Sequence, residues 1–122
     1  MEAIAFITSL HQTVVNEDLK TYQDILSSDT KKITDKCWLP IVVMYQQFSN
    51  EEKENFLNFI RLIEVNTVSH VLGILDGSAY LDANQEEFRL ICQSDDEVIN
   101  GDLQDYFLGL EEDPEAIAEQ KK

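Results

Sequence analysis

Apolar side chains recur every three or four positions in the first quarter of the chain, with polar side chains between them. The stripe consists of Ile4, Ile7, Val14, Val15, Leu19, Tyr22, Ile25 and Leu26, and His11 falls on it as well. This spacing is that of a helix with one face in a core. It predicts an amphipathic helix over residues 2–27, which the polar run at 27–32 ends.

Two further helices are indicated by the residues at their starts. The segment 37–45 is the most apolar of the chain, and its Pro40 suits the first turn of a helix. We therefore expect a short buried helix that reaches Phe48. Ser49 followed by Glu52 forms a capping box and predicts the start of a long helix. Apolar positions continue that helix as far as Gly77, a natural helix stop.

The segment 82–93 fits two patterns. Asp82 with Gln85 resembles another capping box, whereas Phe88, Leu90 and Cys92 alternate as they would in a strand. We prefer a strand over 88–93. The sequence then predicts a mainly α protein, a compact single-domain helical bundle over residues 1–122 with this small strand element, and α+β as the alternative.

The last part of the chain predicts two short helices. Asn100 and Gly101 supply a turn, after which apolar positions from Leu103 to Leu110 follow a helical period. Pro114 follows an acidic cap residue and would begin a tail helix with little apolar surface.

The charge of the chain is strongly negative and unevenly spread. Its 24 Asp and Glu residues against 9 Lys and Arg give −15, and residues 62–122 carry −12 of this. Such a surface repels nucleic acid and anionic membranes and attracts cationic proteins. We expect a basic protein partner, with no nucleic acid and no membrane. The hydrophobic fraction of 43% indicates a folded chain.

The chain start and the cysteines bear on the compartment. Residues 1–7 are apolar only briefly and carry Glu2 in place of a basic residue, which is not the pattern of a signal peptide. A cytoplasmic protein is expected. Cys37 and Cys92 lie in apolar surroundings far apart in sequence, so two buried thiols are favoured over a disulfide.

Metal sites were sought in the acidic clusters. A calcium loop starting at Asp96 would have Val98 at its third position and Phe107 at its twelfth, where charged ligands are needed, and one starting at Asp82 lacks the glycine at its sixth. The histidines and cysteines show no zinc spacing. His70 shares a predicted helix face with apolar positions and is expected to be a core histidine.

Catalytic motifs are missing as well. The sequence contains no Gly-x-Ser-x-Gly, no Cys-x-x-Cys and no phosphate-binding glycine loop. Its acidic residues are too numerous for any one pair to indicate catalysis. We therefore predict no catalytic residues, no cofactor and no metal, and a protein that is not an enzyme.

Acidic residues alternate with aromatic residues in the second half of the chain. An interface with a basic protein needs carboxylates for steering and pairing and aromatic side chains for buried area. The candidate partner-binding residues are Asp76, Tyr80, Asp82, Asp95, Asp96, Glu97, Asp102, Asp105, Tyr106 and Phe107.

In size, acidity and acid–aromatic clusters such as 102–107, the chain resembles the small acidic immunity proteins of bacterial toxin systems, including contact-dependent growth inhibition and colicin-type nuclease systems. The resemblance implies a one-to-one complex that blocks the active site or substrate groove of a basic toxin domain, such as a nuclease. Two alternatives stay open. One is a nucleic-acid-mimicking or adaptor protein that binds a basic host factor, and the other is a small helical ligand-binding domain or enzyme.

Overall fold

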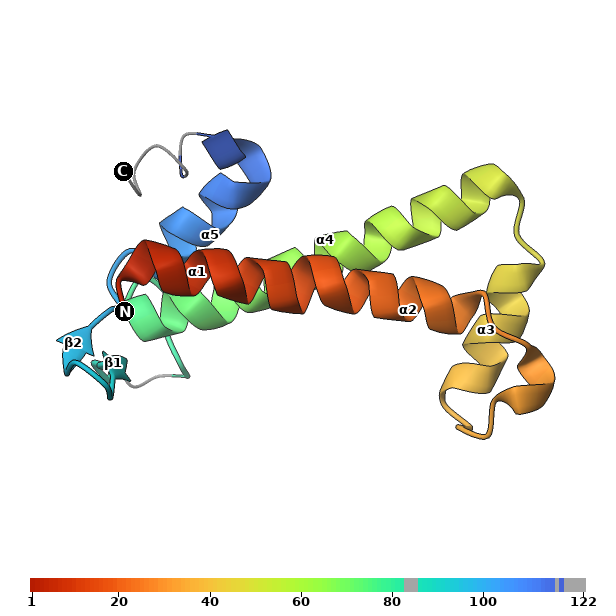
Figure 1. Ribbon diagram of the computed structural model, residues 1–122, viewed down its shortest axis with the longest axis horizontal. Coiled ribbons are helices and arrows are strands. Elements are labelled where there is room, and N and C mark those ends of the chain that lie inside the picture. The colour runs from red at the N-terminus through yellow and green to blue at the C-terminus, as the bar shows by residue number, and fades with distance from the viewer. Residues whose placement is uncertain (83–85, 116, 118–122) are drawn as a thin grey trace.

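The computed structural model describes residues 1–82, 86–115 and 117. Its first element is one long helical rod (Figure 1), made of α1 (Ala3–His11), the π-helical segment η1 (Gln12–Glu17) and α2 (Asp18–Leu26). This confirms the helix predicted over residues 2–27. The π-helical turns in its middle were not predicted. Such segments are rare, mostly single turns within α-helices, and frequently lie at functional sites.

The second and third helices begin as their first residues predict. After a 3₁₀ turn, η2 (Thr30–Lys32), α3 (Trp38–Gln46) starts where Asp35 accepts hydrogen bonds from the backbone N–H groups of residues 37 and 38. In α4 (Asn50–Asp76) the Ser49 hydroxyl accepts from Glu52 N at 3.1 Å, and the Glu52 carboxylate accepts from Ser49 N at 2.9 Å. Gly77, at φ 86°, ends α4. The capping box and the glycine stop are confirmed.

The remaining elements are small. Strands β1 (Ile91–Cys92) and β2 (Glu97–Val98) pair antiparallel, so the strand predicted near 88–93 exists but is two residues long. The predicted turn at 100–101 leads into α5 (Leu103–Glu112). The mainly α class with a small strand element is confirmed. The alternative capping box of Asp82 with Gln85 and most of the tail helix predicted from Pro114 lie outside the described residues.

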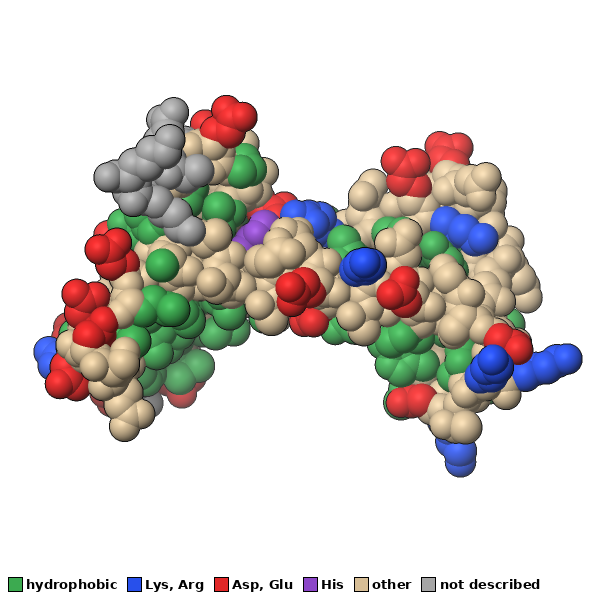
Figure 2. Space-filling view, in the orientation of Figure 1, with side chains coloured by type: hydrophobic (Ala, Val, Ile, Leu, Met, Phe, Trp, Pro, Cys, Tyr) green, Lys and Arg blue, Asp and Glu red, His purple; other side chains and the backbone are tan. Residues whose placement is uncertain are grey.

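Two hydrophobic cores lie at opposite ends of the rod. The first core joins α1, η1, the C-terminal half of α4 and α5 around Ile7, Val15, Val65, Leu72, Leu103 and Phe107. The second joins α2, α3 and the N-terminal half of α4 around Leu26, Val42 and Tyr45. Figure 2 shows the result as two bulky ends with a narrower middle. Only the two long helical elements, α1–η1–α2 and α4, run through both cores.

Three burial predictions are wrong. In α3 only Val42 and Tyr45 are buried, because this helix packs at one end of the molecule and contacts its neighbours along a single stripe. Cys37 is exposed and Cys92 is partly exposed, although both are free thiols as expected. His70 lies on the exposed side of α4 and is not a core histidine.

Candidate protein-binding surface

The predicted partner-binding residues gather at one end of the molecule, where the end of α4, the β1–β2 hairpin and the start of α5 meet (Figure 1). We call residues 76–82 and 86–105 the acidic end. It contains nine carboxylates against the single basic side chain of Arg89. All of these carboxylates except that of Asp76 belong to exposed residues. Figure 2 shows acidic side chains at this end, whereas most visible Lys and Arg side chains lie at the other.

Asp76 has a structural role at the acidic end. Its Oδ1 accepts a hydrogen bond from Gly101 N at 2.6 Å, and its Oδ2 accepts one from Gln104 N at 2.8 Å. These donors lie at the N-terminus of α5, where backbone N–H groups lack partners within the helix. Asp102 occupies the N-cap position itself but forms no side-chain cap bond. Asp76 therefore caps α5 from the end of another helix.

Asn100 holds the loop that precedes the hairpin. Its Oδ1 accepts from Leu90 N at 2.8 Å, while its Nδ2 donates to the carbonyl oxygens of Leu75 at 2.5 Å and Phe88 at 2.7 Å. The uncharged side chain of Asn100 thus joins the end of α4 to the segment 88–90, which leads into β1. The sequence indicated Asn100 only as part of a turn.

Gln104 fastens α5 to α4. Its Nε2 donates to the carbonyl oxygen of Ser69 at 3.0 Å, and its Oε1 accepts from the hydroxyl of Ser78 at 3.0 Å. A Cβ placed on Gly73 would lie 2.8 Å from the Gln104 amide nitrogen, so a larger residue there would push this amide away from its position. Together with Asp76 and Asn100, Gln104 forms what we call the amide clamp, which fixes the acidic end without using its exposed charges.

The carboxylates of the hairpin differ in the ion pairs and hydrogen bonds that they form. Asp95 forms an ion pair with the amino group of Met1 and accepts a hydrogen bond from Glu97 N at 3.1 Å. The hydrogen bond from that amino group is the main reason why the pKa of Asp95 is lowered. Asp96 is exposed in a left-handed conformation, at φ 57°. Glu97 is exposed as well, and its Oε2 lies 4.0 Å from the Met1 amino group. The hairpin thereby presents the carboxylates of Asp96 and Glu97 on its surface.

The aromatic residues of the prediction fall into three environments. Tyr80 is 66% exposed, and Tyr106 packs partly against the first core. Phe107 has no exposed surface and meets the ring of His11 edge to face at 5.4 Å between centroids. It is therefore not available to a partner. Other exposed apolar side chains of the acidic end had not been predicted: Leu81, Phe88, Ile91 and Val98.

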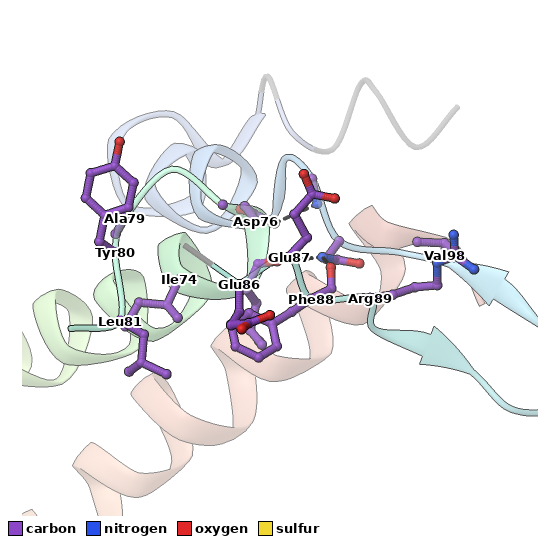
Figure 3. Close-up of a pocket in the computed structure, with 14 residues that line it drawn as sticks. Ile74, Asp76, Ala79, Tyr80, Leu81, Glu86, Glu87, Phe88, Arg89 and Val98 are labelled. Atoms are coloured by element: carbon purple, nitrogen blue, oxygen red, sulfur yellow. Dashed lines mark hydrogen bonds between the residues drawn. The ribbon is translucent and has the colours of Figure 1, made fainter. Parts of the chain in front are cut away.

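A cleft of about 500 Å³ opens between these side chains. Figure 3 shows Tyr80 and Leu81 on one side of it, and Arg89 and Val98 on the other side toward the hairpin. Phe88 lies between them, beside two glutamates. The cleft thus has a mixed lining, in which apolar side chains lie beside carboxylates, Arg89 and Asn100. It could receive an apolar or cationic side chain of a partner.

A second polar cluster lies in the narrow middle of the molecule, at the π-helical segment. His11 Nε2 is 2.6 Å from Glu111 Oε1, Arg61 Nη2 donates to the same oxygen at 2.6 Å, and Arg61 Nη1 donates to Asn16 Oδ1 at 3.1 Å. Burial by itself would raise the pKa of Glu111, but the hydrogen bonds from Arg61 and His11 outweigh it and hold this pKa below its ordinary value. The cluster ties α1, α4 and α5 together. We find no nucleophile in it.

Glu64 lies one turn along α4 from Arg61. Its Oε1 is buried and has no hydrogen-bond partner among the described residues. Burial and the negative charge of Asp18 raise the pKa of Glu64, and Arg61 offsets only part of this effect. The charged carboxylate of Glu64 thus destabilises the folded state at neutral pH.

Metal binding and membrane insertion have no candidate site in the described part of the chain. Within residues 1–82, 86–115 and 117 no three His, Cys, Asp or Glu side chains lie close enough together to hold a metal ion. None of the helices in this part of the chain is both long and apolar enough to cross a membrane. Comparison with protein-family models, with curated proteins and with solved structures finds no match to the chain.

Proposed function

We propose that the chain is an immunity-type inhibitor that binds the basic domain of a toxin, such as a nuclease, through its acidic end. The observation that supports this best is the mixture at one end of the molecule. Exposed carboxylates surround exposed apolar side chains there, and the amide clamp holds both in place. Carboxylates alone would be a solvated surface, whereas the combination has the composition of a binding interface.

The two kinds of side chain would contribute differently to binding. Uncompensated charges at the edge of an interface mainly accelerate association, because they attract a cationic surface over about 10 Å at 0.1 M salt. Apolar side chains at its centre mainly slow dissociation. Tyr80 and Phe88 flank the cleft and are the expected anchors. Because the amide clamp fixes the backbone in advance, little ordering remains to be done on binding.

Such a function needs one partner and no chemistry. The inhibitor covers the active site or the substrate groove of the toxin in a one-to-one complex, and its carboxylates pair with basic groups that otherwise contact substrate. This is in keeping with the missing catalytic motifs of the sequence.

The first experiment is to co-express the tagged chain with the product of the adjacent upstream gene and to follow both complex formation and growth. A one-to-one complex and rescued growth would support the proposal. If the product is toxic and the chain neither binds it nor protects against it, that product is not the partner; if an unbiased pull-down then also yields no basic protein, the proposal is refuted.

Charge-reversal variants test the surface. The double variant Asp96→Lys/Glu97→Lys should lower the association rate at low salt at least about tenfold. The matched control is Glu51→Lys/Glu54→Lys, because both residues are exposed at the start of α4 near the second core. Equal association rates for the two double variants would show that the acidic end does not steer the partner.

Anchor variants test the cleft. Tyr80→Ala or Phe88→Ala should raise the dissociation rate about tenfold or more while the association rate changes little. Ile41→Ala is the control, because Ile41 is a comparably exposed apolar residue on α3, outside the acidic end. If both anchor variants dissociate as slowly as the control, the cleft lies outside the interface.

A further inference from the structure

One long face of α4 is exposed and carries no charge. All of α4 lies within the described residues, and between positions 55 and 71 nine of its residues are exposed. We call them the α4 face: Asn55, Asn58, Phe59, Leu62, Ile63, Asn66, Thr67, His70 and Val71. None is an acid, a lysine or an arginine, although charged residues make up 27% of the chain. The charged residues of this stretch, Arg61 and Glu64, belong to the inward polar groups described above.

The α4 face is also apolar where it is most exposed. Phe59 is 57% exposed, Leu62 54%, Ile63 48% and Val71 52%. A water-facing side of a helix in so acidic a protein is expected to carry carboxylates, and an uncharged apolar strip of this length marks a contact surface. It is distinct from the acidic end, because it follows the middle of α4 and not its C-terminal end.

The chain has surface to spare for such a contact. Its accessible surface is 8563 Å², whereas a compact chain of 14.0 kDa exposes about 6,700 Å². The excess is about 1,900 Å², and a stable dimer buries roughly 800 Å² on each partner. The chain therefore exposes more surface than a compact monomer of its mass, and the excess is larger than the share that one partner buries in a stable dimer.

We infer that a second copy of this chain covers the α4 face, with the two α4 helices antiparallel about a twofold axis between residues 64 and 65. The exposed positions are self-complementary about that point. Ile63 then lies opposite Asn66 of the second copy, Leu62 opposite Thr67, and Phe59 opposite His70. A twofold interface requires such reciprocal pairing. It places the most exposed apolar side chains of each copy beside the axis or against a polar residue that carries no charge.

Charge selects the antiparallel arrangement over the parallel one. A parallel pair would bring together two acidic ends, each with nine carboxylates and one arginine. In the antiparallel pair the acidic end of one copy lies toward the α3 end of the other. Residues 24–56 at that end carry six acids against Lys31, Lys32, Lys36 and Lys53, a net charge of −2 compared with −8 for the acidic end. The antiparallel arrangement therefore keeps the two most acidic parts apart by the length of α4 and lowers the repulsion between the copies.

This inference does not rest on the proposed function, and its test uses the full chain without any partner. Sedimentation equilibrium should show a monomer–dimer equilibrium at micromolar concentrations. The variant Ile63→Glu, which places a carboxylate from each copy next to the axis, should raise the dimer dissociation constant at least about 100-fold. Val98→Glu is the control, because Val98 is equally exposed but lies in the hairpin. A wild-type chain that stays monomeric at about 100 µM, or an Ile63→Glu variant that dimerises like the control, would overturn the inference.

Cross-linking tests the arrangement. In a background with both native cysteines replaced by serine, Asn66→Cys pairs would lie about 10 Å apart across the axis, since packed helices are 8–10 Å apart. Asn55→Cys pairs would lie about 28 Å apart along the antiparallel helices but about 10 Å apart in a parallel pair. A short bifunctional reagent should cross-link Asn66→Cys only. Cross-linking at both positions, at Asn55→Cys alone or at neither position would overturn the antiparallel pair.

Discussion

The cap that Asp76 provides for α5 gives a direct test of the acidic end. Replacing Asp76 with alanine leaves the N–H groups of Gly101 and Gln104, now held at 2.6 and 2.8 Å from the carboxylate, without their acceptor. A hydrogen bond to a charged group contributes about 1.5–3 kcal/mol. Because the site is partly exposed, water replaces some of this. We expect a loss of about 2–3 kcal/mol in the free energy of unfolding, a large fraction of the total for a small domain.

The assay is urea unfolding followed by circular dichroism, together with hydrogen exchange. With a slope of about 1.5 kcal/mol per molar urea, the midpoint should fall by about 1.3–2 M while the slope stays unchanged. The amides of Gly101 and Gln104 should lose protection more than amides of the second core. The urea midpoint of Asp76→Asn, which keeps one acceptor oxygen, should lie between that of the wild type and that of Asp76→Ala.

Asp102→Ala is the matched control for Asp76→Ala. Asp102 occupies the N-cap position of α5 and is the residue that sequence rules favour as the cap, but its side chain forms no cap bond. Its replacement should cost less than about 0.5 kcal/mol, the effect of one exposed charge near a helix end. If the two variants lose the same stability, the cap assigned to Asp76 is wrong.

Three further predictions concern single side chains. Phe107→Ala should cost about 3–5 kcal/mol in urea unfolding, because Phe107 is fully buried, whereas Tyr80→Ala should cost less than about 0.5 kcal/mol; equal costs would contradict the core assignment. Glu64→Gln should stabilise the fold at pH 7 by about 1 kcal/mol, because it removes the negative charge from a side chain whose Oε1 is buried without a hydrogen-bond partner among the described residues. The folded pKa of Glu64 is raised, so this gain should shrink as the pH falls through that pKa and should vanish below the unfolded value of about 4.3, where the wild-type carboxyl is neutral in both states. A gain independent of pH would refute the reasoning. Gly77→Ala should lower the free energy of unfolding by about 1 kcal/mol, because alanine is strained at the φ of 86°. Nothing lies within 4 Å of the added Cβ, so no clash contributes. An unchanged unfolding midpoint would contradict this.

The helices could be predicted from the sequence because their signals are local. The capping box at Ser49 and the glycine stop at Gly77 each depend on residues within a few positions, and the structure has both. The π-helical segment in the first rod has no comparable signal. It leaves the apolar spacing almost unchanged, so a periodic pattern does not distinguish it from α-helix.

The burial of side chains in α4 could not be predicted in the same way. Apolar residues lie on nearly every side of this helix, so its pattern does not indicate which side meets the core. That is why His70 was expected to be buried and is exposed, while His11 on α1 is the buried histidine. The choice is made by α5, η1 and α2, which are distant in sequence from most of α4 and pack against it.

The predicted binding residues show the same limit. Asp76 was assigned to the surface as one acid among many, and the donors it binds are 25 and 28 positions away. Phe107 could have been assigned to the core, because it lies with Leu103 and Leu110 in the helical pattern of α5. The exposed apolar side chains near the cleft have no pattern of their own. Their position depends on the amide clamp and therefore on the folded structure.

The acidic end poses a problem for folding that the amide clamp resolves. Its carboxylates repel one another, and Arg89 is the one basic side chain that its sequence supplies in return. The segment is held by Asn100 and Gln104, which are uncharged, and by Asp76, whose charge is used on backbone N–H groups. Among the exposed carboxylates, that of Asp95 pairs with the Met1 amino group and accepts a hydrogen bond from Glu97 N, whereas the amide clamp itself uses none of them. Added salt should consequently raise the stability of the acidic end, because screening relieves the repulsion among its carboxylates. The same salt should lower the affinity for a basic partner, because screening weakens the attraction between them. An acidic surface that served the fold through ion pairs would lose stability and affinity together.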